Sequence, residues 1–441
     1  MQRVSSVIII GAGLGGLACA IECRRQGLNV LLLLYQMQVH IVVGAGIQIP
    51  PNGSRILQRF GLLPKISDRA TVVERIDVRR YEDGQMLCSK EQTLSSIENY
   101  GAPWFVIHRQ DYHGILLEEA TRLGAAIRLG ASVKNILTDR DTVVLEDGTE
   151  LTANAIIGAD GIWSVTREIL LERSAPPIET GDLAYRATFT RADLEALKDS
   201  RVDELCAQNS VTLWMGPNKH VVFYPLRNGA EFNMVLLRPD DLPEGVKTAH
   251  GELGEMRATF EGWDPVLLKL ISCIPSVLKW KLLHHEELQT WTKKHVALLG
   301  DACHPTLPYQ AQGAAMAVED GAVLGVLLGK LKSAPDSTGA RLHSSGDSTD
   351  SVTSMLKIYE DQRKQRTTLN VQGALRNRWF YHMVDGEEQQ NRDRFLRAVT
   401  DWEAVKSPYT WADAQYNRDL LGYDSIAPAE HAFDSWFLEN S

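Results

Sequence analysis

The sequence predicts an α/β protein with a three-layer, Rossmann-like domain, an inserted antiparallel-sheet domain and C-terminal helices. Residues 7–10 form a short β-branched run that ends in glycine, as buried parallel strands often do. Residues 14–26 carry small and apolar side chains at helical spacing, and Gly27 can end that helix. Residues 29–34 are again continuous aliphatics. This order predicts a βαβ unit with a glycine turn between strand and helix.

The rest of the chain divides into segments of different periodicity. Residues 72–90 and 179–240 alternate apolar and polar residues between turn signals, which predicts antiparallel strands of a separate sheet. Residues 310–332 and 353–382 have helical periodicity. Residues 334–352 are rich in Ser, Gly, Asp and Thr, which indicates a mobile surface loop. The tail after this last helix carries tryptophans and is expected to be irregular.

Length, charge and cysteine content exclude several classes of protein. A chain of 441 residues predicts two or three domains, and its formal net charge of -10 argues against a nucleic-acid partner. The chain has no apolar window of about 18 residues that would predict a membrane span, and its first strand begins too early for a signal peptide. Six scattered cysteines fit a reduced, cytoplasmic location. We expect no metal site, because the adjacent side chains of His284-His285-Glu286-Glu287 point apart.

Three motifs that each follow an apolar strand carry the functional signal. They are Val7-Ile-Ile-Ile-Gly11-Ala-Gly13-Leu-Gly-Gly16, Ile157-Gly158-Ala159-Asp160-Gly161-Ile-Trp-Ser164 with Arg167, and Val296-Ala-Leu-Leu-Gly300-Asp301-Ala-Cys-His304-Pro305. A single glycine turn occurs in many α/β proteins, and a single aspartate can merely cap a helix. The ordered set of three predicts a site for one flavin dinucleotide.

Each motif has a physical reason to lie beside a dinucleotide. Gly11 permits the tight turn out of the strand, Gly13 lets a pyrophosphate approach the backbone, and Gly16 lets helix and strand pack closely. The helix N-terminus offers free N–H groups and the positive end of its dipole to the phosphates. Asp160 and Asp301 end their strands, where they can accept hydrogen bonds from ribitol or ribose hydroxyls.

The chain resembles the FAD-dependent aromatic hydroxylases (group A flavoprotein monooxygenases), and among them the fungal salicylate-hydroxylase-like branch. The resemblance covers residues 5–330 and, more loosely, the tail. Besides the three motifs it rests on Gly44-Ala-Gly-Ile-Gln48-Ile-Pro-Pro-Asn52, His108-Arg109-Gln110-Asp111, Tyr185-Arg186, Tyr224-Pro225-Leu-Arg227 and Pro308-Tyr-Gln-Ala-Gln-Gly313-Ala314-Ala-Met-Ala-Val-Glu319-Asp320. It implies noncovalent FAD, and NADPH or NADH as a co-substrate that docks transiently.

The resemblance also implies roles for individual residues. The predicted FAD site comprises Gly11, Gly13, Gly16, Ala45, Gly46, Arg109, Asp160, Asp301, Gly313 and Ala314. Arg186 and Tyr224 match residues at the substrate ring that are often assigned the catalytic role. An interdomain salt bridge is the alternative for Arg186, and core packing is the alternative for Tyr224. Gln48 and Pro308 are the predicted substrate contacts.

The predicted domains are discontinuous in the sequence. The FAD-binding domain comprises residues 1–75, 103–178 and 285–332, and the substrate-binding sheet domain comprises residues 76–102 and 179–284. Residues 333–352 form the mobile loop, and residues 353–441 form a C-terminal helical region.

One segment departs from the family pattern. The family ends its second strand with a glutamate that binds the adenosine ribose, but Leu31-Leu-Leu-Leu34-Tyr35-Gln36-Met-Gln-Val-His40 contains no acid. Leu34 or Tyr35 occupies that position, and the spacing to Gly44 is one residue longer. The missing charged hydrogen bond weakens FAD binding by about 1.5–3 kcal/mol unless Tyr35 or Gln36 replaces it.

The function implied by the resemblance is oxygenation of a phenol. Such an enzyme uses NAD(P)H and O2 to hydroxylate a phenolic aromatic compound, salicylate-like or a polyketide phenol, through a flavin C4a-hydroperoxide. The protein has to exclude water, hold the ring and help the phenol lose its proton. Two other functions stay open: an FAD-dependent oxidase or dehydrogenase of a small molecule, and a catalytically silent flavoprotein-like binding protein. A monomer or a homodimer fits each of them.

Overall fold

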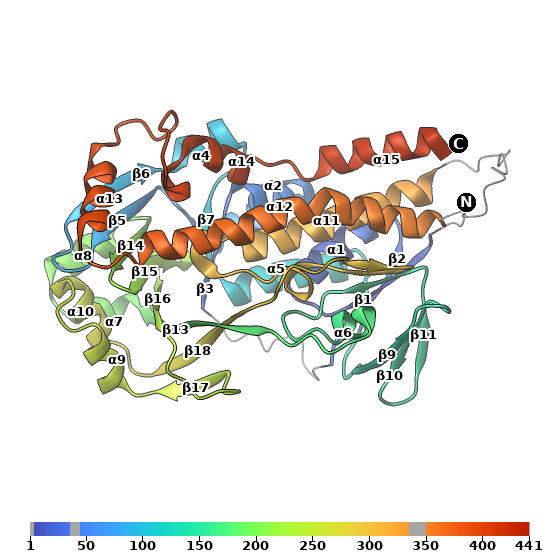
Figure 1. The fold of residues 1–441 in the computed structure, drawn as a ribbon, viewed down its shortest axis with the longest axis horizontal. Helices are drawn as coiled ribbons and strands as arrows, with labels where there is room; N and C mark the ends of the chain where they lie inside the picture. The colour runs from blue at the N-terminus through green and yellow to red at the C-terminus, as the bar shows by residue number, and fades with distance from the viewer. Residues whose placement is uncertain (1–3, 36–44, 335–349, 441) are drawn as a thin grey trace.

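The computed structural model describes residues 4–35, 45–334 and 350–440. The loop predicted over residues 334–352 lies almost wholly outside these ranges, as do Gln36 and Gly44. Two large sheets organise the described chain. Figure 1 shows them towards opposite ends of the molecule, with long helices running past both.

The first sheet is six-stranded and mainly parallel. Its strand order is β19-β20-β12-β1-β2-β8, and every pair is parallel except β19–β20. The strands are β1 (Ser6–Ile10), β2 (Asn29–Leu33), β8 (Ala126–Arg128), β12 (Ala155–Gly158), β19 (Thr292–Lys293) and β20 (Val296–Leu298). The strands predicted over residues 7–10 and 29–34 are confirmed. Each of the three motifs leaves this sheet at the carboxyl end of one strand, where α/β proteins bind their ligands.

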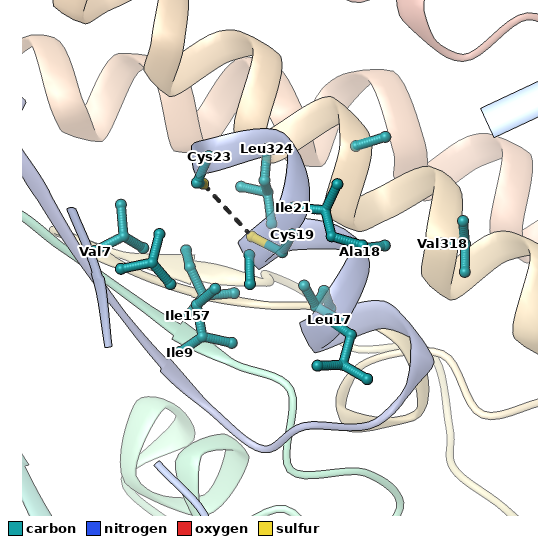
Figure 2. Packing of buried hydrophobic residues seen from close by; sticks show 14 of the residues in the cluster. Val7, Ile9, Leu17, Ala18, Cys19, Ile21, Cys23, Ile157, Val318 and Leu324 are labelled. Atoms are coloured by element: carbon teal, nitrogen blue, oxygen red, sulfur yellow. Dashed lines mark hydrogen bonds between the residues drawn. The ribbon is translucent and has the colours of Figure 1, made fainter. Parts of the chain in front are cut away.

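Helix α1 (Leu14–Arg25) lies between this sheet and helix α11 (Gly313–Ser333). Figure 2 shows Val7, Ile9 and Ile157 of the sheet on one side of α1, and Val318 and Leu324 of α11 on the other. Helix α5 (Arg109–Arg122) packs beside α1 in the same layer. The apolar helix predicted from the first motif is therefore the centre of the helical layer.

Small residues let α1 and α11 touch backbone to backbone. A Cβ atom added at Gly321 would lie 2.5 Å from the backbone N of Cys19 and 2.5 Å from the carbonyl O of Gly15. One added at Gly325 would lie 2.6 Å from Cβ of Glu22. Protein interiors are close-packed, so these glycines fix the distance between the helices.

The opposite face of the parallel sheet is covered by a β-meander. Its strands are β9 (Val133–Leu137), β10 (Thr142–Leu145) and β11 (Glu150–Thr152), paired antiparallel. Ile136, Val143 and Leu145 are buried in the same apolar cluster as the parallel strands. Figure 1 shows the meander on the side away from α11. Helices, parallel sheet and meander form the three layers that the sequence predicted.

The second sheet has eight strands in the order β17-β18-β13-β16-β15-β14-β5-β6. The strands are β5 (Arg75–Arg80), β6 (Met86–Glu91), β13 (Ile178–Thr190), β14 (Ser210–Gly216), β15 (Lys219–Leu226), β16 (Glu231–Pro239), β17 (Thr248–Gly251) and β18 (Val277–His284). The predicted antiparallel pairing is correct except at β14–β5, which pair in parallel. These two strands come from distant parts of the chain, so no hairpin forces them to run in opposite directions.

A small sheet and short helices connect the two large sheets. The small sheet has the order β3-β7-β4, with β3 (Gly46–Ile49), β4 (Ala70–Val72) and β7 (Phe105–His108). The shorter helices before the C-terminal region are α2 (Pro51–Phe60), α3 (Leu63–Ser67), α4 (Thr93–Tyr100), α6 (Val165–Leu171), α7 (Arg191–Glu195), α8 (Ser200–Cys206), α9 (Leu253–Thr259) and α10 (Pro265–Ser272). Single 3-10 turns are η1 (Arg227–Gly229), η2 (Gly300–Ala302), η3 (Pro308–Gln310) and η4 (Thr410–Ala412).

The C-terminal helices predicted from the sequence are confirmed, but the last part of the chain is more regular than the expected irregular tail. After α12 (Ser351–Tyr381), the expected irregular tail contains α13 (Glu387–Ala398), α14 (Ala414–Leu421) and α15 (Ile426–Asn440). The tryptophans explain the difference, because Trp402 and Trp411 pack into a buried cluster around Phe380. None of the helices in the described ranges is long and apolar enough to cross a membrane.

We expect Gly321→Ala to destabilise the protein by about 1–3 kcal/mol, because the added methyl group overpacks the α1–α11 contact. Chemical denaturation measures the free energy of unfolding. Gly254→Ala is the control, since that glycine has nothing within 4 Å of its added Cβ. Equal stability of the two variants would contradict the inference that the contact is tight.

Candidate functional site

The first motif forms a turn that only glycines allow. Gly11 has φ +105°, and a Cβ there would lie 2.3 Å from the carbonyl O of Ala159. A Cβ at Gly16 would lie 2.2 Å from the carbonyl O of Gly11. Gly13, in contrast, is exposed and has open space beside it. It is the N-cap of α1 and no side chain caps that helix, so the N–H groups of the first turn face space that a pyrophosphate fits.

The third motif places Asp301 in a recess. Gly300 has φ +60°, and Asp301 follows it in η2. The Asp301 carboxyl is reached by solvent. Surrounding protein nevertheless raises its pKa by desolvation, while the charges of His304 and Arg109 oppose that rise. An acceptor that is accessible and closely surrounded fits a ligand hydroxyl, as the sequence predicted.

A buried polar network holds this motif from behind. The Gly300 N–H donates to Oδ2 of Asp320 (3.0 Å), and Nε2 of His304 donates to the same oxygen (2.5 Å). Arg363 of α12 binds Oδ1 of Asp320 (2.7 Å) and Oε2 of Glu319 (2.6 Å). Burial acts to raise the pKa of Asp320, but His304 and Arg363 lower it to about 2. Asp320 is therefore a permanent anion that fixes the backbone before Asp301.

The same network reaches the start of α11. The Asn52 amide donates to Glu319 (2.7 Å) and to Gln312 (2.9 Å), the residue just before Gly313. The Gln312 side chain does not cap α11. Gly313 and Ala314 are half-buried at the helix N-terminus, and Pro308 before them is exposed. The predicted isoalloxazine contacts thus lie at the accessible positive end of a long helix dipole.

Asp160 of the second motif holds the start of a helix, which the sequence analysis gave as the alternative role of such an aspartate. The Asp160 carboxylate accepts from Oγ of Ser164 (2.6 Å) and from the N–H (2.9 Å) and hydroxyl (3.0 Å) of Thr166, at the start of α6. Its side chain is thus engaged within the protein. Its backbone N faces the turn, 3.0 Å from where a Cβ of Gly11 would lie. Contact of Asp160 with the cofactor stays a prediction.

Arg167 connects the second and third motifs, which the sequence did not reveal. Its buried guanidinium donates to the carbonyl oxygens of Ile162 (2.8 Å), Ala175 (2.9 Å) and Ala302 (3.2 Å). These acceptors are backbone groups from three segments. Only the spacing of Arg167 to the second motif was visible in the sequence, so its partners could not be identified.

Ala45, Gly46 and Arg109 meet at the edge of the small sheet. The Arg109 N–H donates to the carbonyl O of Ala45 (3.0 Å), and the Arg109 side chain is exposed. The Gly46 N–H donates to Oδ1 of Asn233 (2.7 Å). A Cβ on Gly46 would lie 2.5 Å from the Tyr224 ring. This predicted FAD segment therefore rests directly on the eight-stranded sheet.

Arg186 and Tyr224 lie on one face of that sheet. Arg186 pairs with Val235, and Val235 pairs with Val222, which is two residues from Tyr224. Nε of Arg186 is buried and has no hydrogen-bond partner among the described residues. The guanidinium carbon lies 5.4 Å from the centroid of the Trp280 ring. The predicted salt-bridge alternative for Arg186 finds no support in the described ion pairs.

Burial changes the acid–base properties of both side chains. Desolvation and the charge of Arg109 lower the pKa of Arg186, against the influence of Tyr224. Desolvation raises the pKa of Tyr224, while Arg186 and Asn233 oppose the rise. The Tyr224 hydroxyl is therefore protonated at neutral pH and can donate a hydrogen bond.

A cavity opens on the same face of the sheet. It is lined by Gln48, Ile76, Lys90, Gln92, Trp104, Val211, Leu213, His220, Val222, Pro308, Tyr309, Gln310, Ala311, Asn377, Tyr381, Trp411, Tyr416, Asn417, Leu420 and Leu421. Both predicted substrate residues, Gln48 and Pro308, are among them, and Oε1 of Gln48 accepts from the Trp104 indole (3.2 Å). Arg186 and Tyr224 are not.

The part of the cavity wall that comes from the C-terminal helical region escaped the sequence analysis. The C-terminal helical region supplies Asn377, Trp411 and Tyr416, which are scattered over three elements. Apolar and aromatic walls with a few amides are typical of small-molecule sites. The described residues contain no cluster of His, Cys, Asp and Glu that could hold a metal ion.

Leu34 and Tyr35, the two candidates for the position of the family's glutamate, lie in different environments at the end of β2. Leu34 is buried in the main apolar cluster with 8% of its surface exposed. Its N–H donates to the carbonyl O of Arg128 (3.0 Å). Tyr35 is 72% exposed, so it is the outward-facing residue beside the first turn. Leu34 is thus a core residue, and a role of Tyr35 at the ribose stays a prediction.

Comparison with known proteins adds independent evidence. The model of a family described as an FAD binding domain matches residues 4–339. The FAD-dependent monooxygenase OpS4 of Beauveria bassiana (strain ARSEF 2860) is 37% identical over 435 residues, which is 97% of this chain and 96% of that protein. A 3-hydroxybenzoate 6-hydroxylase of Klebsiella oxytoca is 32% identical over 419 residues, covering 94% of this chain and 98% of its own.

Solved structures agree on the fold. A salicylate hydroxylase in a substrate complex matches with a TM-score of 0.76 at 22% identity, over 98% of each chain. CtdE in complex with FAD and a substrate matches with a TM-score of 0.78 at 20% identity, over 99% of this chain and 100% of that one. Because the family match and the curated relatives cover most of a chain whose three motifs converge at one sheet edge, the protein belongs to the FAD-dependent aromatic hydroxylases.

Proposed function

We propose that this hydroxylase oxygenates a phenolic aromatic compound, salicylate-like or a polyketide phenol, with NAD(P)H and O2 as co-substrates. The observation that carries the proposal is Arg186, an interior guanidinium whose Nε is unpaired among the described residues. It shares a sheet face with Tyr224 and with the cavity. An interior cation without a partner favours binding of a phenolate or carboxylate. Two relatives are named for such compounds, 3-hydroxybenzoate and salicylate.

The cofactor contacts follow from the same geometry. We assign the pyrophosphate to the turn at Gly11, Gly13 and Gly16, with the Asp160 backbone beside it, and a flavin hydroxyl to Asp301. The assigned isoalloxazine contacts are Ala45, Gly46, Arg109, Gly313 and Ala314. Support comes from the open space at Gly13, the accessible Asp301 carboxyl and the uncapped start of α11. Bound FAD supplies the redox chemistry, taking two electrons from NAD(P)H and using them to activate O2.

The side chains of this chain prepare the phenol. One oxygen atom replaces a ring hydrogen and the other leaves as water, at the cost of two electrons from NAD(P)H. The positive charge of Arg186 lowers the pKa of a bound phenol, because an opposite charge favours the ionised form. The phenolate is the better nucleophile towards activated oxygen. The protonated Tyr224 hydroxyl donates to the same oxygen and holds the ring in place.

The way NAD(P)H binds and the cellular location are further parts of this proposal. NAD(P)H docks only transiently, since the sequence carries one strand–glycine–helix fingerprint, which we assign to FAD. A cytoplasmic location is supported by the six free cysteine thiols. Among them, Cys19 and Cys23 lie buried with their sulfurs 3.9 Å apart.

Asp301→Ala should lower FAD affinity about ten- to a hundredfold, because a charged acceptor for a flavin hydroxyl is lost. Flavin content after purification and a titration of apo-protein with FAD measure the effect. Asp361→Ala is the control, since that carboxylate is 59% exposed on α12. Full occupancy and unchanged affinity in Asp301→Ala would remove Asp301 from the site.

Tyr35→Glu should tighten FAD binding, whereas Leu34→Glu should destabilise the fold. The exposed position 35 lets a carboxylate stay hydrated until it meets the ribose hydroxyls. At position 34 the charge enters the apolar cluster at a cost of several kcal/mol. FAD titration and thermal melting of both variants test the pair. A gain in affinity for Leu34→Glu would reverse the assignment of inward and outward residues.

Arg186→Ala should keep its FAD and still oxidise NAD(P)H, but release the electrons as hydrogen peroxide. Loss of the phenolate partner slows oxygen transfer about ten- to a hundredfold. Arg186→Lys should recover only part of the coupling, because an ammonium group cannot form the two parallel hydrogen bonds of a planar guanidinium. Tyr224→Phe should lose rate with little loss of stability. The readout is the product formed per NAD(P)H consumed, with peroxide measured in parallel. If Arg186→Ala and Tyr224→Phe both couple NAD(P)H oxidation to product as well as the wild type does, the two residues have only a structural role.

A further inference from the structure

Lys90 is a buried lysine whose ammonium group has no hydrogen-bond or ion-pair partner among the described residues. It lies near the end of β6, is 4% exposed and lines the cavity. Among the described residues it forms no hydrogen bond or ion pair. Its nearest recorded contact is the Trp402 ring, whose centroid lies 6.0 Å from Nζ. A lysine this deeply buried is normally paired, since desolvating an ammonium group is costly.

The register of the eight-stranded sheet places Lys90 on the face that lines the cavity. Lys90 pairs with Ile76, and Ile76 pairs with Val211. Because Thr212 pairs with Phe223, the next residue of this row is Tyr224. The row crosses three strand spacings, so the backbones of Tyr224 and Lys90 are about 14 Å apart. Because paired residues share a face, the side chains of Lys90 and Tyr224 both lie on the sheet face that lines the cavity.

Among the described residues that line the cavity, Lys90 is the one cation. The lining residues include no carboxylate and no other lysine or arginine. His220 is neutral, because burial and the nearby His382 lower its pKa. Burial also lowers the pKa of Lys90, while the charge of Glu403 opposes the change. Glu403 makes no ion pair with Lys90 among the described contacts, so the ammonium group stays free to bind an anion in the cavity.

We propose that Lys90 binds a carboxylate of the aromatic substrate, at the end remote from the ring carbon that is hydroxylated. The inference rests on the proposed function and narrows it to phenolic carboxylic acids. Gln48 and Pro308 line the cavity and are close in sequence to the predicted flavin contacts Gly46 and Gly313, whereas Lys90 lies on the edge strand of the sheet. A substrate that spans the cavity therefore has one end near the predicted flavin contacts and the other end near the Lys90 ammonium group.

Binding to the FAD-loaded full chain tests the proposal without turnover. The probes are salicylate, 3-(4-hydroxyphenyl)propanoate and 4'-hydroxybiphenyl-4-carboxylate, each compared with its methyl ester. Dissociation constants come from quenching of tryptophan fluorescence, since Trp104 and Trp411 line the cavity, and thermal shifts give a second measure. We expect the wild type to bind at least one acid more tightly than its ester. In Lys90→Met that acid should lose about ten- to a hundredfold in affinity.

Matched variants separate a ligand-binding lysine from a structural one. Without ligand, Lys90→Met should melt no lower than the wild type, because it removes an unpaired buried charge. Lys90→Arg should keep the preference for the acid, and Lys90→Gln should lose it. Lys134→Met, at an exposed lysine of β9, should behave as the wild type.

Three results would overturn the proposal. They are a wild type that prefers no acid over its ester, a Lys90→Met or Lys90→Gln variant that keeps the preference, and a Lys90→Met variant that melts well below the wild type without ligand. Product formed per NAD(P)H is scored separately. If none of the six compounds is oxygenated, the proposed function fails, while the dissociation constants still decide the role of Lys90.

Discussion

The backbone-to-backbone contact between α1 and α11 is the constraint on which the cofactor site depends. α1 begins at the glycine turn and α11 begins at Gly313, so the N-termini of both helices lie where the motifs leave the parallel sheet. Gly321, Gly325 and Gly329 recur every four residues along the contact, and a side chain at any of them would meet α1 within 2.6 Å. Two helix dipoles are thereby held at a fixed spacing, matched to one elongated ligand.

A buried group of charged side chains sets the position of the third motif. The loop of the third motif is short and irregular, and its position is set by the Asp320 anion, which binds Gly300, His304 and Arg363 together. Arg363 comes from α12, which also contacts β19 and η4, so one long helix joins the cofactor side to the cavity side. Removing one member of such a buried ionic group leaves an unpaired charge, which typically costs about 3–5 kcal/mol.

The eight-stranded sheet brings the substrate chemistry to the cofactor. Alternation along each strand puts Arg186, Tyr224 and Lys90 on one face, although they come from β13, β15 and β6. Tyr224 and Asn233 also support Gly46, so the face that carries the substrate residues touches a predicted FAD segment directly. If these assignments hold, the same strands position phenol and flavin, which would keep their relative placement rigid.

The sequence by itself determined the parts that are local. Glycine spacing, apolar runs and helical periodicity predicted β1, α1, β2, α11 and α12, because each depends on residues within one turn or one strand. The three motifs could also be read directly from the sequence, and the family followed from the resemblance of these and further motifs. Tertiary structure alone decided the partners of Asp320 and Arg167, the parallel β14–β5 pair, the inward Leu34 and the unpaired Lys90. Those depend on strand register and on contacts between distant segments. A one-residue change of register in β6, for example, would turn Lys90 to the other face of the sheet.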